Sequence, residues 1–176
     1  MGGRQKGARV LARNDRHNCV LEALVNLRYM PPFWETTRLE DMNQDQWESL
    51  CDGCGRCCLN KLEDTDTHEI CFTNVACTLL DAQSCRCRHY KKRHRYVPDC
   101  LVLTPQTVFE NPSLPSSCAY RRLAEGRPLA AWHPLLSEQP DTVHGAGVSV
   151  RGRTLSEDHV HEEQLEDHIV DWFDGD

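Results

Sequence analysis

The pattern of hydrophobic and polar positions along the chain predicts short elements separated by turns. Asn43 and Gln46 have the spacing of a capping box. A helix of about two turns should follow, with Trp47 and Leu50 on one apolar face. Runs rich in β-branched and apolar residues predict short strands at 70–75, 100–104 and 147–152.

Two more helices are expected further along. Ser116 or Ser117 can cap one that stops at Gly126, because glycine readily adopts the conformation that ends a helix. The apolar residues of 157–173 fall near one face, which predicts a last helix. Short elements of both kinds predict a small irregular α+β domain.

The start of the chain differs from the rest. Residues 1–16 are rich in glycine and arginine and show no hydrophobic periodicity, which is typical of disorder. A short helix is expected over 20–27. We therefore predict an extension over 1–30 and a cysteine-cluster metal-binding domain over 31–176.

Composition limits the core that this domain can build. A chain of 176 residues suits one domain, but hydrophobic residues make up 39% and aromatic residues 7% of it. The eleven cysteines therefore indicate that something other than packing cross-links the fold.

Charge is unevenly placed on a chain whose net charge is −7. Residues 86–95 carry six Arg or Lys, whereas residues 156–176 carry nine Asp or Glu. Two solvated faces explain this pattern most simply. Nucleic-acid binding by the basic run, with Tyr90 and Tyr96 as stacking faces, is an alternative that the acidic balance does not favour.

Targeting signals also bear on the chemistry of the cysteines. The apolar stretch VLEALVNL is broken by Glu22 and Asn26, and no run approaches the roughly 18 residues of a membrane helix. We therefore expect a cytoplasmic protein with no membrane partner. Thiols stay reduced in that compartment, so close cysteine pairs there more often bind metal than form disulfides.

The stretch CDGCGRCC at 51–58 contains the strongest local motif. A metal knuckle needs a sharp reversal, so that two thiolates converge while backbone N–H groups turn toward their sulfurs. Gly53 and Gly55 permit this reversal, because glycine adopts a positive φ without strain. Cys51 and Cys54 are therefore predicted to form the converging pair.

Cys57 and Cys58 extend this motif in different ways. Cys57 completes a C-x2-C-x2-C spacing, which is similar to the run that holds a cubane iron–sulfur cluster. Cys58 should not easily share an ion with Cys57, because neighbouring side chains diverge in extended backbone. It could serve a second ion, bridge a cluster or pack as a small apolar residue.

Five later cysteines complete the candidate set. Cys118 falls in the first turn of a predicted helix, where the helix dipole should lower the pKa of a thiol. The candidate metal ligands are Cys51, Cys54, Cys57, Cys58, Cys77, Cys85, Cys87, Cys100 and Cys118. These nine permit two mononuclear sites, or a cluster with a second site. Cys19 and Cys71 fit neither group, and Cys71 is expected to be a buried free thiol in its strand.

Other polar residues receive simpler interpretations. Arg56, Arg86 and Arg88 adjoin the ligands in sequence and could offset thiolate charge through N–H···S contacts. His133 is predicted to be a packing or turn histidine. The histidines of the last helix are expected on a solvated face, and LEDTDTHEI at 62–70 is predicted to be a hydrophilic loop.

From residue 32 onward, the chain resembles a bacterial family named for its CxxCxxCC motif and described as zinc- or iron-chelating, in particular its YcgN-type branch. The likeness lies in WESLCDGCGRCCLNKLEDTDT, FTNVAC, CRCRHYKKR, PDCLVLT, CAYRRLAEG, WHPLL, SVRGRT and EDHIVDW. It implies that the nine candidate ligands are the family cysteines. A remoter likeness, through the cysteine motif alone, is to the cluster-bearing part of flagellin lysine methylases.

These patterns together predict a metal-binding protein whose α+β fold is organised around cysteine-ligated metal. The knuckle glycines favour zinc, and the C-x2-C-x2-C spacing favours iron, including an iron–sulfur cluster. The alternatives are an iron–sulfur enzyme for redox or protein-modification chemistry, and a zinc-stapled module that binds nucleic acid or protein.

Overall fold

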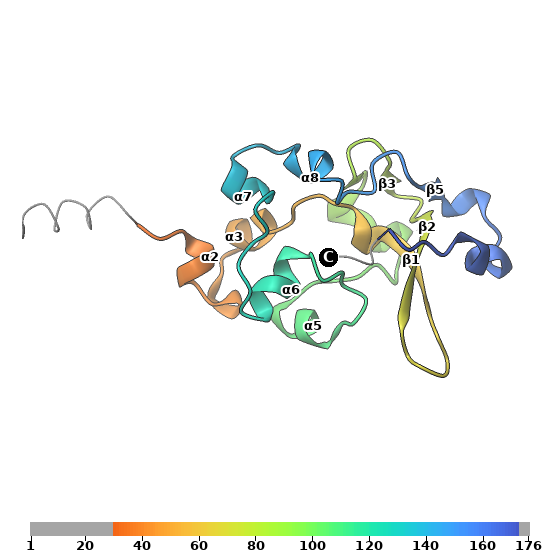
Figure 1. Cartoon of the computed structure of the whole chain (residues 1–176), viewed down its shortest axis with the longest axis horizontal. Coiled ribbons are helices and arrows are strands. Elements are labelled where there is room, and N and C mark those ends of the chain that lie inside the picture. The colour runs from red at the N-terminus through yellow and green to blue at the C-terminus, as the bar shows by residue number, and fades with distance from the viewer. Residues whose placement is uncertain (1–29, 173–176) are drawn as a thin grey trace, which may run out of the picture. The chain divides into compact units, whose positions relative to one another are not determined.

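A computed structural model describes residues 30–172 of the chain. The chain divides into two compact units, Met1–Thr36 and Thr37–Asp176. The described part of the first unit contains helix α2 (Phe33–Thr36), drawn in orange in Figure 1. The helix expected over 20–27 lies outside the described residues, and the boundary expected at residue 30 stays a prediction.

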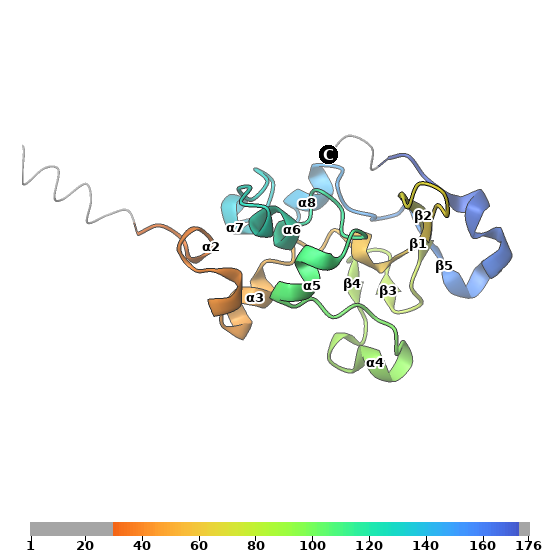
Figure 2. The same cartoon turned by 90° about the horizontal axis from the view of Figure 1, so that it is seen from below.

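The second unit is a small mixed α/β structure built from many short elements. Its helices are α3 (Gln44–Ser49), α4 (Arg93–Tyr96), α5 (Pro105–Glu110), α6 (Ala119–Ala124), α7 (Pro134–Ser137) and α8 (Thr142–Gly145). Its strands are β1 (Leu59–Glu63), β2 (Ile70–Ala76), β3 (Leu80–Asp81), β4 (Arg86–Cys87) and β5 (Leu155–Ser156). Within this unit, α3, α5, α6 and α7 gather on one side and β1, β2 and β5 on the other, as Figure 1 and Figure 2 both show.

Short 3-10 helices join these elements: η1 (Leu39–Asp41), η2 (Arg56–Cys58), η3 (Tyr90–Lys92), η4 (Glu157–His159) and η5 (Glu162–His168). The strands form two small sheets. One has the order β1-β2-β5, in which β1 and β2 are antiparallel and β2 and β5 parallel. The other pairs β3 with β4, and Leu80 lies opposite Cys87.

The two elements with the clearest local signals are confirmed. The Asn43 side chain accepts from the N–H of Gln46, and the Gln46 side chain accepts from the N–H of Asn43, so the capping box starts α3 as expected. The strand expected at 70–75 is β2. The hydrophilic loop expected at 62–70 is narrower, because its ends belong to β1 and β2 and only residues 64–69 turn. Asp64 Oδ1 accepts there from the N–H groups of Asp66 and Thr67.

Helix α6 is shorter at its start than expected. Cys118 is its N-cap, so the helix begins at Ala119 and stops before Gly126, whose φ is +69°. The Tyr120 hydroxyl donates to the carbonyl of Trp47 at 2.9 Å, and the two rings pack with centroids 4.8 Å apart. This contact ties the segment that carries Cys118 to the helix that precedes Cys51.

Two predicted strands are wrong. Residues 100–104 are irregular, because Thr104 caps α5 with its side chain and Pro105 begins that helix. Residues 147–152 bond to two different segments and so cannot join one sheet. The N–H of Val150 donates to the backbone carbonyl of Cys54 at 2.9 Å. The N–H of Gly152 donates to the carbonyl of Ala82 at 3.2 Å.

The predicted last helix is also wrong. Residues 157–173 contain the 3-10 helices η4 and η5, separated by extended backbone at Val160. His161 restarts the chain as the N-cap of η5. Ile169 then forms an antiparallel β-bridge with Thr73 of β2, and the N–H of Val170 donates to the carbonyl of Phe72 at 2.9 Å. Pairing with the sheet therefore outweighs the weak helical periodicity of this acidic segment.

The apolar core is small and contains cysteine. One buried cluster consists of Leu59, Ala76, Leu80, Cys85 and Val150. Another consists of Cys54, Val143 and Val148, with Trp132 against it. No helix in the described part of the chain has both the length and the apolar character needed to cross a membrane.

We predict that Gly55→Ala destabilises the fold more than Gly126→Ala. Both glycines have a positive φ, which costs an alanine about 1–2 kcal/mol. A Cβ on Gly55 would also lie 2.8 Å from Val150 Cγ2 and 3.2 Å from Cys85 Cβ, whereas a Cβ on Gly126 meets open space. Overpacking should add about 1–3 kcal/mol at Gly55. Urea unfolding measures the free energy of unfolding of each variant. An equal loss of this free energy in the two variants would contradict the close packing at Gly55.

Candidate metal centre

The knuckle at residues 51–55 has the predicted conformation. Gly53 and Gly55 have φ of +79° and +76°, so both adopt the left-handed region that the reversal requires. The N–H of Gly53 donates to the sulfur of Cys51, and the N–H of Arg56 donates to the sulfur of Cys54. Backbone N–H groups that point at sulfur stabilise a thiolate, as metal-binding turns require.

Cys57 and Cys58 lie closer together than expected. They belong to the 3-10 helix η2 and not to extended backbone, and their thiols lie within hydrogen-bond reach of each other. The Cys58 thiol donates a hydrogen bond to the Cys57 sulfur, which lowers the pKa of Cys57 and raises that of Cys58. Cys57 is therefore the thiol of this pair that ionises first.

Cys118 receives two backbone hydrogen bonds. The N–H groups of Tyr120 and Arg121 both donate to its sulfur at the start of α6. Burial nevertheless raises the pKa of Cys118 to about 12, so the expectation that the helix lowers this pKa is wrong. A helix of six residues has a weak dipole, and desolvation of the thiolate outweighs it.

Four cysteines form what we call the knuckle set: Cys51, Cys54, Cys57 and Cys118. Cys57 interacts electrostatically with each of the other three. Arg56 links their segments, because its guanidinium donates to Ser117 Oγ at 3.0 Å and to the carbonyl of Val148 at 2.7 Å. The fold thus gathers residues separated by more than fifty positions of sequence.

Solvent reaches only part of the knuckle set. Cys54 is buried and Cys118 is half-buried, whereas Cys51 and Cys57 are exposed. Protein packed around the rest of the Cys51 side chain still displaces enough water to raise the pKa of this thiol to about 11. The exposed sulfurs give an ion a route of entry.

Asp52 lies among the knuckle set and was not identified from the sequence. Its side chain is buried, and Oδ1 accepts from the N–H of Cys54 at 2.8 Å. Its other oxygen, Oδ2, is buried without a hydrogen-bond partner in the described residues. The Asp52 carboxylate also interacts electrostatically with all four thiols of the knuckle set. A buried carboxylate oxygen without a partner is costly, and a nearby cation would stabilise it.

A second group of cysteines lies beside Cys58, and we call it the hairpin set: Cys58, Cys77, Cys87 and Cys100. The N–H of Cys77 donates to the carbonyl of Cys58 at 2.8 Å. Cys58 interacts electrostatically with Cys77 and Cys100, and Cys77 interacts with Cys87 and Cys100. All four are half-buried.

The remaining cysteines lie apart from these two sets. Cys85 packs in the apolar cluster with Leu80 and Val150 and accepts a hydrogen bond from the Ser149 side chain. Cys71 lies in β2 opposite Leu62, half-buried where a buried thiol was expected. Cys19 lies outside the described residues. The ten cysteines within residues 30–172 are all free thiols.

The cationic side chains that lie near the cysteine sulfurs are only partly those expected from the sequence. Arg86 Nη1 lies 3.7 Å from Cys51 Sγ, as predicted. Arg88 instead lies near Asp81, with Nε 3.8 Å from Oδ2. Two cations that the sequence did not single out contribute. Arg93 hydrogen-bonds the sulfur of Cys100, and Lys61 interacts electrostatically with Cys54, Cys57 and Cys58.

His133 has the structural role predicted for it. It is 1% exposed, and its Nδ1 accepts from the N–H of Leu135 at 3.1 Å. Its Nε2 lies 3.1 Å from the carbonyl of Leu50, to which it therefore donates. His133 thus packs behind the residue that precedes Cys51.

The two tyrosines of the basic run already contact neighbouring side chains. The Arg93 guanidinium lies 4.3 Å from the ring centroid of Tyr90, whose hydroxyl donates to Glu48 Oε2 at 2.8 Å. Tyr96 stacks on His89 with centroids 4.8 Å apart. Both side chains remain exposed, Tyr90 by 48% and Tyr96 by 54%, so nucleic-acid binding by this run stays a prediction.

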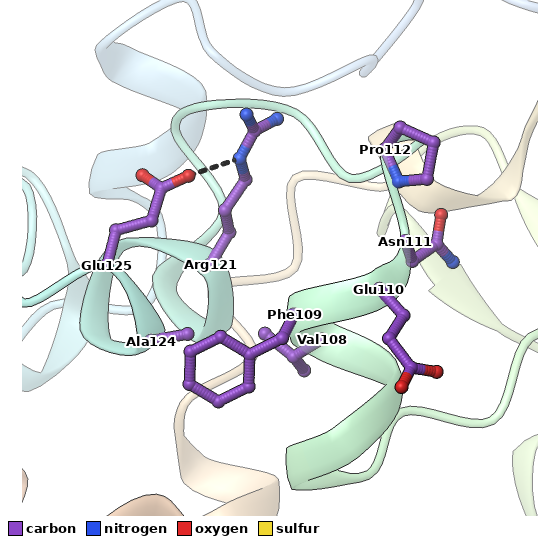
Figure 3. A pocket seen from close by; sticks show the side chains of 8 residues that line it. All are labelled: Val108, Phe109, Glu110, Asn111, Pro112, Arg121, Ala124 and Glu125. Carbon is purple, nitrogen blue, oxygen red and sulfur yellow. Dashed lines mark hydrogen bonds and ion pairs between the residues drawn. The ribbon is translucent and has the colours of Figure 1, made fainter.

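A surface pocket between α5 and α6 is separate from the cysteine sets. Figure 3 shows its eight lining residues, which include no cysteine and no histidine. The ion pair between Arg121 and Glu125 lies along it. This pocket holds no converging groups that could do chemistry.

The sulfurs are gathered but not yet arranged around an ion. Among residues 30–172, no three His, Cys, Asp or Glu side chains stand in an arrangement that could hold a metal. Any metal held by these residues would therefore require their side chains to rotate from the positions described.

Comparison with known proteins agrees with this chemistry. Residues 50–119 match the family model CxxCxxCC, described as "Putative zinc- or iron-chelating domain". The chain is 58% identical over 141 residues to a UPF0260 protein of Rhizobium meliloti, which covers 80% of this chain and 91% of that protein. It is 57% identical over 142 residues to a UPF0260 protein of Marinobacter nauticus, which covers 81% and 96%. No solved structure matches the chain.

The comparisons define the chain first as a cysteine-cluster protein with a zinc- or iron-chelating type of domain. More particularly, it belongs to the UPF0260 family of bacterial proteins. The resemblance to the CxxCxxCC family stated from the sequence is confirmed, whereas the likeness to flagellin lysine methylases stays a prediction.

We predict that Arg86→Gln slows alkylation of Cys51 in the metal-free protein by up to about fivefold, because the guanidinium stabilises the reactive thiolate. Arg88→Gln is the matched control, since Arg88 lies near Asp81. Iodoacetamide labelling followed by peptide mass spectrometry measures both rates. An equal effect of the two substitutions would show that Arg86 has no specific action on Cys51.

Proposed function

We propose that this chain binds zinc or iron through a thiolate centre formed by the knuckle set, Cys51, Cys54, Cys57 and Cys118. One observation carries the proposal: these four sulfurs share their surroundings with a buried Asp52 oxygen that has no hydrogen-bond partner in the described residues. A cation would stabilise the carboxylate and the thiolates together.

The donor set fits either metal. Thiolate is a soft ligand that suits zinc and iron alike, and four thiolates can satisfy a tetrahedral ion. The reversal at Gly53 and Gly55 has the conformation of a zinc knuckle. The C-x2-C-x2-C spacing equally suits three corners of an iron–sulfur cluster.

Net charge at this centre needs compensation from the protein. Four thiolates around a divalent ion carry a net charge of about −2, and Asp52 adds to it. Arg86 beside Cys51 and Lys61 near Cys57 are placed to reduce this charge. Lys61 also donates to the carbonyls of Cys57 and Leu59, at 3.2 and 2.7 Å, which holds its ammonium group in place.

The bound metal would also supply folding energy. Cys54 belongs to a buried apolar cluster with Val143 and Val148. In domains of this kind, metal-binding energy is folding energy. The centre would therefore add to the hydrogen bonds that already join α3, η2 and the start of α6.

We predict that Cys54→Ser loses metal and stability together. Cys54 is the buried member of the knuckle set, so a serine there removes a ligand and leaves the site incomplete. Cys71→Ser is the matched control, because Cys71 lies in β2 away from both sets. Elemental analysis of anaerobically purified protein and thermal unfolding measure the two effects.

The same preparation identifies the metal. A colourless protein with stoichiometric zinc indicates a zinc centre, whereas a brown protein with iron and sulfide indicates a cluster. Wild-type protein that contains no zinc or iron after anaerobic purification, and that binds neither metal when it is added, would refute the proposal. So would a Cys54→Ser protein that keeps its full metal content.

We predict that metal binding releases protons and strengthens as pH rises from about 6 to about 8. Burial raises the pKa of Cys51 to about 11 and that of Cys118 to about 12. Raised values mean that both groups are neutral thiols at pH 7 in the metal-free protein, and each must lose its proton to bind. Zn²⁺ calorimetry in two buffers of different ionisation enthalpy measures the release. Affinity independent of pH would contradict thiol ligation.

A further inference from the structure

We infer that the hairpin set, Cys58, Cys77, Cys87 and Cys100, forms a second metal site separate from the knuckle set, and that Cys85 is a ligand of neither. This inference rests on the proposed function and extends it. The nine candidate cysteines then divide into four, four and one.

The first argument is the backbone that joins Cys58 to Cys77. The N–H of Cys77 donates to the carbonyl of Cys58 at 2.8 Å, directly beyond the paired residues Leu59 and Ala76. This hydrogen bond holds the two cysteines beside each other at the end of the β1–β2 pairing. Their relative position is therefore fixed by the sheet and not by a flexible loop.

The short hairpin of β3 and β4 brings Cys87 to the same place. The N–H of Leu80 donates to the backbone carbonyl of Cys77 at 2.9 Å, and Leu80 lies opposite Cys87 in the sheet. The N–H of Leu79 donates to the sulfur of Cys77, which lies two residues before it in the chain. The knuckle has the same spacing of donor and acceptor: the N–H of Gly53 donates to the sulfur of Cys51, and the N–H of Arg56 donates to the sulfur of Cys54.

Cys100 completes the set from the segment after α4. It interacts electrostatically with Cys87, and both Cys58 and Cys77 interact with it; its weaker interaction with Cys57 reaches the junction with the knuckle set. The Arg93 guanidinium hydrogen-bonds its sulfur. Arg93 thus serves the hairpin set as Arg86 serves the knuckle set, which gives each group of thiols its own cation.

The two sets meet at one peptide bond. Cys57 and Cys58 are neighbours in η2, and Cys58 donates its thiol hydrogen to Cys57. Lys61 lies near both, so one ammonium group can reduce the charge at the junction. This arrangement explains why the motif ends in two adjacent cysteines: each belongs to a different site.

Cys85 has a different environment. It is 3% exposed inside an apolar cluster with Leu59, Leu80 and Val150. Its side chain also packs against Gly55, so closely that a Cβ added to this glycine would lie 3.2 Å from the Cβ of Cys85. Cys85 therefore supports the knuckle from behind as a packing residue.

Anaerobic titration of metal-free protein with Co²⁺ tests this division, because tetrahedral thiolate sites give an intense and countable absorption. We expect about two equivalents for the wild type, since each site uses four thiolates. Cys118→Ser and Cys100→Ser should each bind about one equivalent, and the double variant none. Cys85→Ala should keep about two, with circular dichroism confirming that every variant is folded.

Each other result overturns the inference in a recognisable way. Saturation of the wild type at one equivalent leaves the proposed function standing but removes the second site, and this measurement needs no variant to fold. Loss of all Co²⁺ binding in both folded single variants indicates one shared cluster. A folded Cys85→Ala protein that binds only one equivalent shows that Cys85 is a ligand. A wild type that binds no Co²⁺, zinc or iron refutes the proposed function itself.

Discussion

The left-handed conformation of Gly53 and Gly55 is the constraint on which the arrangement of the cysteines depends. It reverses the chain so that backbone N–H groups face the sulfurs of Cys51 and Cys54. The same reversal leaves the carbonyl of Cys54 free to accept from Val150, which brings the 147–152 segment against the back of the knuckle. One turn therefore sets both the positions of the first sulfurs and the packing behind them.

Electrostatic balance is the second organising element. In the proposed centre, the thiols of Cys51 and Cys118 would become anionic beside an Asp52 carboxylate that is already buried. Cations approach from separate elements, with Arg86 in β4 and Arg93 in α4. Two of the six cations of the basic run 86–95, Arg86 and Arg93, therefore lie beside thiols, whereas Arg88 lies near Asp81.

The features predicted correctly from the sequence are those that local chemistry decides. The capping box of α3, the stop at Gly126 and the two knuckle glycines all depend on a few adjacent residues. The segments at 100–104, 147–152 and 157–173 were predicted wrongly, because their backbone hydrogen bonds go to distant partners or to a cap. Strand β1 was missed because LNKLE has little β-branched character and is a strand only through its pairing with β2.

The candidate site was predictable to a similar degree. The residue type and spacing of the cysteines selected the nine candidates, but only the fold shows which of them are neighbours. The pairing of Cys58 with Cys77 depends on sheet register, and the burial of Asp52 depends on packing, so no local pattern indicated either. Asp52 could have been suspected from its place inside the knuckle, between two candidate ligands.

The exposure of Cys51 and Cys57 has a consequence for the lifetime of any bound ion. Cys54 is enclosed, so an ion held by the knuckle set would be anchored on one side and open on the other. An incoming thiol could then replace the surface ligands one at a time, without unfolding of the chain, and metal could pass to or from another carrier by ligand exchange. The same two sulfurs are the ones that oxidants reach first, so loss of the ion and oxidation of the site would begin at the same place.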